Sequence, residues 1–167
     1  MTRVADVAVF VDGDEEAEAL LHLLTGDGFV VETTIEQVVT GRLATARLRH
    51  PDAGSLVTDL LFASSGIERE VVAGAERLDV LPGVRLPVAT VGSLIALKLL
   101  AREDRSRPND ADDLASLRVV ATDADWAEAA DAVELIRLRG YHRDRDLAAA
   151  LQVLRTNGAY GDAPTGA

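Results

Sequence analysis

The sequence contains no cysteine among its 167 residues. Disulfide bonds, thiolate zinc sites and cysteine nucleophiles are therefore excluded. No apolar run approaches the roughly 20 residues that a membrane-spanning helix needs, and no signal peptide is recognisable. We therefore expect a cytoplasmic protein with no membrane partner.

Basic residues are also scarce, with 17 lysines and arginines against 28 acids and a formal net charge of −11. This balance argues against broad, non-specific affinity for nucleic acid, because such affinity depends on neutralising phosphates. It leaves a local basic patch open. The acidic surface fits either solubility alone or a basic protein partner.

Two common kinds of catalytic site are missing. The three histidines, His22, His50 and His142, are scattered without metal-ligand spacing, and we expect each on the surface. No G-x-S-x-G elbow occurs, and Gly26-Asp27-Gly28 reads as a helix stop rather than a phosphate loop.

The composition that remains is that of a folded soluble protein, 48% hydrophobic and 27% charged. Alternating and helical periodicities predict the elements in order. Extended segments are expected over residues 3–11, 29–32, 43–50, 55–63, 77–81 and 85–89, with residues 33–40 ambiguous and a candidate turn of helix. Helices are expected over residues 14–24, 67–75 and 91–101, from 109, and over 147–154. A further helix is expected from 123 to Gly140, with Thr122 as its cap and Asp125 in a capping-box-like position. Its apolar positions are Trp126, Ala129, Ala130, Val133 and Ile136.

Strands mixed with helices come first and helices alone follow. This order predicts an α/β (α+β) fold, a mixed sheet flanked by helices and then a small C-terminal helical portion. We expect a domain over residues 1–120, C-terminal helices over 121–158 and a disordered tail over 159–167. Pro51 to Gly54 predict the turn of a hairpin between residues 43–50 and 55–63.

A lone lysine stands in the apolar stretch 91–101, which Thr90 is placed to cap. Lys98 shares a helix face with apolar neighbours, so its ammonium group must reach solvent, shift its pKa or find an anion. Pro108 begins a second helix with aspartates in its first turn. Two helices joined by a short connection tend to pack antiparallel, which brings Asp113 towards Lys98.

A second charged residue, Asp59, lies within the apolar strand Leu56–Leu61. A carboxylate there is costly unless it faces a functional site or a cation. The alternative is a solvent-facing Asp59, together with an Asp6 that only marks a strand end.

The stretch LPVATVGSLIALKLLAREDRSRPNDADDLASL resembles the C-terminal part of the core of AbiEii-type nucleotidyltransferases, the toxin halves of bacterial toxin–antitoxin pairs. The resemblance extends through most of the first 117 residues and implies a nucleotidyltransferase-like fold. It places Asp6 at the first position of the family's D-x-D pair and Asp59 at the third carboxylate. These two residues would hold Mg²⁺ or Mn²⁺, while Ala8 stands where the second acid belongs.

By the same resemblance, Lys98 would contact a nucleoside triphosphate and Asp113 would support the site. Thr2-Arg3 matches the family's residues ahead of the first aspartate only loosely, with Arg3 as a nucleotide contact. The family's N-terminal helix and Gly-Gly or Gly-Ser phosphate loop are absent from the sequence as given. We therefore expect either a shortened chain or a degenerate relative.

Three functions follow as hypotheses. The first is a metal-dependent enzyme that transfers a nucleotide from a nucleoside triphosphate to an RNA (tRNA) or protein acceptor, with an antitoxin as its partner. The second is a catalytically degenerate binding module of the same fold, and the third is an interaction protein with a basic partner. A basic cluster either contacts tRNA or a partner, or forms a solvated turn; it comprises Arg137, Arg139, His142, Arg143 and Arg145.

Overall fold

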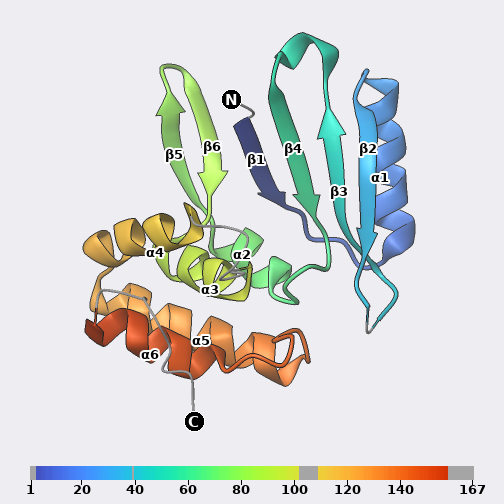
Figure 1. The fold of residues 1–167 in the computed structure, drawn as a ribbon. Helices are drawn as coiled ribbons and strands as arrows, with labels where there is room; N and C mark the ends of the chain where they lie inside the picture. Colours follow the sequence, from blue (N-terminus) through green and yellow to red (C-terminus); the bar gives the residue numbers. More distant parts are fainter. Residues whose placement is uncertain (1–2, 39, 102–108, 158–167) are drawn as a thin grey trace. The chain divides into compact units, whose positions relative to one another are not determined.

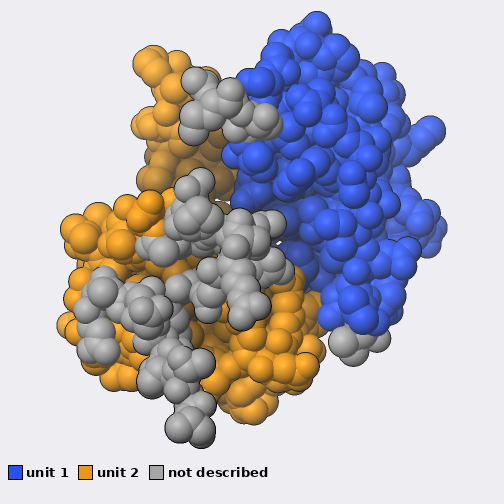
Figure 2. Space-filling view, in the orientation of Figure 1, with its two compact units in different colours: residues 1–73 blue, residues 74–167 orange. Residues whose placement is uncertain are grey.

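The computed structural model describes residues 3–38, 40–101 and 109–157, without the side chains of residues 3, 109–111 and 157. The predicted tail lies outside this part of the chain. The fold is mixed α/β, as predicted: the described residues form six α-helices, a four-stranded sheet and a two-stranded sheet (Figure 1). The chain divides into two compact units, residues 1–73 and 74–167 (Figure 2).

The first unit contains the four-stranded sheet, in the order β1-β4-β3-β2. Its first pair, β1 and β4, is parallel, and the other two pairs are antiparallel. The strand bounds are β1 (Arg3–Ala8), β2 (Val30–Glu36), β3 (Leu43–Arg49) and β4 (Leu56–Leu61).

Helix α1 (Asp14–Gly26) covers one face of this sheet (Figure 1). Its Ala17 packs with Ala46, Leu48 and Leu60 in the unit's buried core. Side chains alternate along a strand, so the residues next to these core positions point to the opposite face of the sheet. Arg47, between Ala46 and Leu48, and Asp59, next to Leu60, therefore lie on that opposite face.

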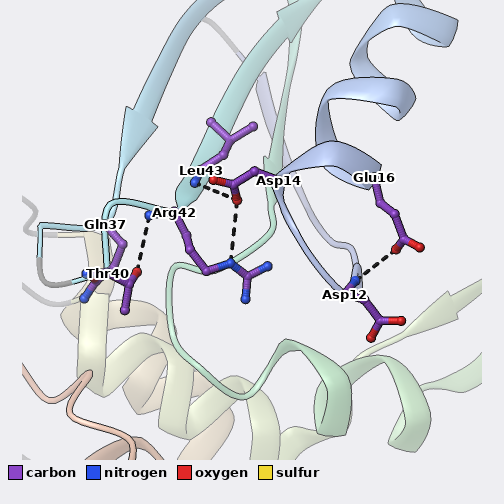
Figure 3. A network of polar contacts seen from close by, with 7 residues as sticks. All are labelled: Asp12, Asp14, Glu16, Gln37, Thr40, Arg42 and Leu43. Carbon is purple, nitrogen blue, oxygen red and sulfur yellow. Dashed lines mark hydrogen bonds and ion pairs between the residues drawn. The ribbon is translucent and has the colours of Figure 1, made fainter.

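A polar network ties the first turn of α1 to the start of β3 (Figure 3). One oxygen of Asp14 accepts a hydrogen bond from the Leu43 N–H at 3.2 Å and lies 3.6 Å from Arg42 Nε. The Glu16 carboxylate accepts from the Asp12 N–H at 2.9 Å. These acids satisfy backbone donors and suit the positive end of the helix dipole.

The hairpin turn predicted at residues 51–54 is confirmed. A 3₁₀ turn covers Pro51–Ala53, and Gly54 has a φ of 61° that favours glycine. After β4, the buried carboxylate of Glu68 accepts from the backbone N–H and hydroxyl groups of Ser64 and Ser65. Glu68 thereby fixes the loop that leads into α2 (Glu68–Gly74).

The second unit combines a hairpin with four helices. The elements are β5 (Glu76–Leu81), β6 (Val84–Val88), α3 (Val91–Ala101), α4 (Asn109–Val120), α5 (Asp123–Leu138) and α6 (Leu147–Asn157). Helix α3 is buried along Ile95 and Leu99 and packs mainly against α5, which buries Trp126 and Ile136. None of the helices in the described ranges is both long and apolar enough to cross a membrane.

Both predicted helix caps in this unit are present. Thr90 Oγ1 accepts from the Ser93 N–H at 3.3 Å, so it caps α3. Thr122 and Asp125 form a reciprocal capping box at the start of α5. The Thr122 hydroxyl and N–H donate hydrogen bonds to the Asp125 carboxylate, and these bonds lower the pKa of Asp125.

Several predicted boundaries were wrong. Strand β1 ends at Ala8 rather than Val11, because its partner β4 ends at Leu61. Strand β2 continues to Glu36 through a bulge, so the ambiguous residues include strand rather than helix. Ala130 is exposed on α5, where Ala132 is buried instead.

The sequence predicted a domain boundary near Ala121. The two compact units divide the chain at a different place, between Ala73 and Gly74. The reason is packing: α3 and α4 contact α5 and α6 and so belong to the same unit as the C-terminal helices.

Candidate functional site

Lys98 and Asp113 form an ion pair, as the sequence predicted. Lys98 Nζ lies 2.7 Å from Asp113 Oδ2, with the two side chains 31% and 52% exposed. Helices α3 and α4 contact each other, and α4 presents Asp113 to the lysine. The ammonium group therefore meets an anion at the edge of the apolar helix that carries it.

Asp59 meets a cation that the sequence analysis did not identify. Arg47 Nε donates to Asp59 Oδ1 at 2.8 Å, and its Nη2 donates to Asp59 Oδ2 at 2.6 Å. This bidentate pair occupies both carboxylate oxygens. The Asp59 side chain is only 13% exposed, whereas the Arg47 side chain that pairs with it is 46% exposed.

Asp6 lies beside this pair on the same sheet face. In the strand register, Asp6 is the direct partner of Asp59, and Asp59 is the direct partner of Arg47. The three residues therefore form a row across β1, β4 and β3. The hydrogen bonds that Arg47 donates to Asp59 raise the pKa of the Arg47 guanidinium, and the negative charges of Asp59, Glu32 and Asp6 add to that effect.

The row contains two carboxylates, as a two-metal site does, but the oxygens of Asp59 are already hydrogen-bonded. Metal-dependent phosphoryl chemistry requires carboxylate oxygens that can bind the ion. Here the oxygens of Asp59 bind Arg47. Across the described ranges, no three histidine or acidic side chains gather closely enough to hold a metal ion.

Ala8 occupies the next position on the same face as Asp6 and pairs with Leu61. Its methyl group supplies no ligand, so this part of the face is apolar. The backbone of Arg3 belongs to β1, and its side chain lies outside the described part of the chain. A nucleotide contact by Arg3 stays a prediction.

Apart from Arg3, the predicted site residues fall into two pairs. Asp6 and Asp59 are neighbours in the first unit, and Lys98 and Asp113 are in contact in the second. The structure thus brings the residues together within each unit. The convergence of the two pairs on one cleft stays a prediction.

Arg47 can be identified from the sequence only once the register of the hairpin is known. In the observed register, which is centred on Ala53, Arg47 and Asp59 both lie six residues from the middle of the turn. Antiparallel pairing places such residues directly opposite each other. The missing step was to fix the register before asking what faces Asp59.

Three members of the predicted basic cluster, Arg137, His142 and Arg145, line a hollow of about 550 Å³ beside the connection from α5 to α6. Arg137 is held by Glu134 through two hydrogen bonds, and Arg145 Nη1 donates to the Leu100 carbonyl oxygen at 3.0 Å. These contacts give the two arginines structural roles. His142 is partly exposed, and its Nδ1 is buried without a hydrogen-bond partner among the described residues.

No protein-family model matches this chain, and no curated protein matches it either.

Proposed function

We propose that the chain is a nucleotidyltransferase-like binding module that does not catalyse nucleotide transfer. The bidentate Arg47–Asp59 pair carries this proposal. By resemblance, Asp59 stands where a third metal-binding carboxylate belongs. A carboxylate whose two oxygens are held by a guanidinium group must give up a strong charge-assisted pair before it can bind a metal ion.

Position 8 supports the same proposal. Strand periodicity aims residues 6 and 8 at one face, so an acid at position 8 would complete a carboxylate pair. Ala8 provides none, and Asp6 is left with a neighbour already bound to Arg47. The ligand implied by the resemblance is a nucleoside triphosphate, with Lys98 as its cation.

The proposal predicts that metal binding is limited by Arg47. Titration calorimetry with Mn²⁺ should give no tight binding to the unmodified chain. Arg47→Met keeps the aliphatic stem and removes the guanidinium group, so it should strengthen metal binding about tenfold or more, which is about 1.4 kcal/mol. Arg49→Met is the matched control, because Arg49 lies on the same strand as Arg47 but pairs with Glu32 of β2, at 2.7 Å.

A result that contradicts the proposal is tight Mn²⁺ binding by the unmodified chain without nucleotide. Equal gains for both methionine variants would also contradict it, because they would reflect a general loss of positive charge rather than release of Asp59.

The second candidate is an active AbiEii-type enzyme that transfers a nucleotide to tRNA or to a protein in a toxin–antitoxin system. The Lys98–Asp113 pair favours it, because the resemblance assigns those two residues to one site. The decisive assay incubates the chain with labelled nucleoside triphosphates, magnesium and total tRNA. Incorporation of label that is lost in Lys98→Ala would establish the enzyme and overturn the binding-module proposal.

A further inference from the structure

The hairpin of β5 and β6 exposes an apolar face. Its cross-strand register pairs Leu78 with Leu86 and Leu81 with Val84. These four side chains are 47%, 48%, 63% and 40% exposed, and every residue of β5 is exposed. A two-stranded hairpin is marginally stable by itself in water, and additional strands stabilise it. A contiguous exposed apolar surface commonly marks an interaction site.

The two free edges of this sheet differ. Its order is β5-β6, so each strand has one edge with no partner strand from the part of the chain that the structure describes. Strand β6 contains Pro87, which has no N–H to donate and therefore blunts its edge. Strand β5 contains no proline. The β5 edge is the one suited to receive another strand.

The centre of β5, Arg77 to Asp79, is complementary to itself in antiparallel orientation. The whole strand reads Glu76-Arg77-Leu78-Asp79-Val80-Leu81. Two copies paired about Leu78 place Arg77 of each opposite Asp79 of the other, and Leu78 opposite Leu78. Opposite charges and apolar pairs at directly facing positions stabilise a sheet.

We infer that β5 pairs with β5 of a second copy of this chain. The product is a four-stranded antiparallel sheet in the order β6-β5-β5-β6, with one continuous apolar face. Pairing about a two-fold axis uses the same edge of both copies, so the assembly is closed. Pro87 lies on both outer strands and opposes further strand addition.

Sedimentation velocity of the full chain over a wide concentration range tests this inference. We expect a monomer–dimer equilibrium that Leu78→Lys weakens about tenfold or more, because it places two ammonium groups face to face at the axis. Leu23→Lys is the matched control, since Leu23 is 67% exposed on α1 in the other unit. It should leave the equilibrium unchanged.

A charge-reversal experiment tests the register. Asp79→Arg and Arg77→Asp should each abolish self-association, because each places like charges opposite each other. An equimolar mixture of the two variants should form a heterodimer, in which every arginine again faces an aspartate. Circular dichroism of each variant checks the fold, because Asp79 also faces Arg85 within the hairpin.

Three results would overturn the inference. The first is a wild-type chain that stays monomeric at all concentrations, which would leave the β5 edge to a different protein. The second is a dimer that both Leu78→Lys and the charge reversals leave intact. The third is a failure of the two charge-reversed variants, each folded, to associate when mixed.

Discussion

Two consecutive residues in the connection after α5 have left-handed backbone angles. Arg143 and Asp144 have φ values of 54° and 56°, and the Arg145 N–H closes the turn on the His142 carbonyl oxygen. Residues with a Cβ are strained in this region, typically by about 1–2 kcal/mol relative to the right-handed conformation. The surrounding contacts must maintain the turn.

Asp144→Gly should therefore stabilise the protein by about 0.5–1 kcal/mol, because glycine adopts a positive φ without the steric cost. Asp27→Gly is the control, since Asp27 has a φ of −86° and gains no relief. The control should destabilise slightly by adding entropy to the unfolded chain. Urea unfolding followed by circular dichroism measures both, and a destabilising Asp144→Gly would show that the side chain matters more than the strain.

At the scale of elements, α3 and α5 approach each other closely at Gly92. A Cβ added to Gly92 would lie 2.7 Å from the Asp125 carbonyl oxygen and 2.8 Å from Glu128 Cβ. Glu128 also accepts hydrogen bonds from Thr90 and Ser93, so it cannot move without breaking them. The absence of a side chain at Gly92 lets the start of α3 contact α5.

Gly92→Ala should destabilise the protein by about 1–3 kcal/mol, the usual cost of overpacking a well-packed site. Gly26→Ala is a suitable control, because Gly26 ends α1 with nothing within 4 Å of its added Cβ. Alanine has the higher helix propensity, so Gly26→Ala should stabilise by up to about 1 kcal/mol. Thermal unfolding of both variants checks the opposite signs, and two changes of the same sign would contradict the close approach.

Local signals predicted most of these elements. The caps at Thr90 and Thr122 and the turn at Pro51 to Gly54 depend on neighbours in sequence, so they were readable. The extent of β2 depends on pairing with β3 and could not be read from its own residues. The candidate site shows the same difference. The Lys98–Asp113 pair could be predicted because the two residues lie on consecutive helices, whereas the Arg47–Asp59 pair could be predicted only from the register of β3 against β4.

At the scale of the whole molecule, charge is the dominant feature. The net charge of −11 comes from 28 acids against 17 bases, so the folded chain carries substantial self-repulsion. Added salt screens charges separated by more than about 10 Å at 0.1 M. Close pairs such as Arg47–Asp59 are screened less, because their atoms are in contact.

The melting temperature should therefore rise by a few degrees when ionic strength increases from about 0.01 M to 0.15 M, where the screening length falls from about 30 Å to 8 Å. Sodium chloride is the titrant, and circular dichroism at fixed pH follows unfolding. Sucrose at matched osmolality is the control for effects other than screening. A falling melting temperature would mean that attractive ion pairs outweigh the net repulsion.

The row of Asp6, Asp59 and Arg47 also makes positions 8 and 47 epistatic. An acid at position 8 would add a carboxylate to the face that already carries Asp6 and Asp59, and the Arg47 guanidinium would offset part of the added repulsion. Removing Arg47 alone leaves Asp59 without its cation on a largely covered site. Either single substitution therefore lowers stability, whereas a bound divalent ion could compensate for both together. An evolutionary path from this chain to a metal-binding form therefore passes through a less stable protein, whichever of the two substitutions comes first.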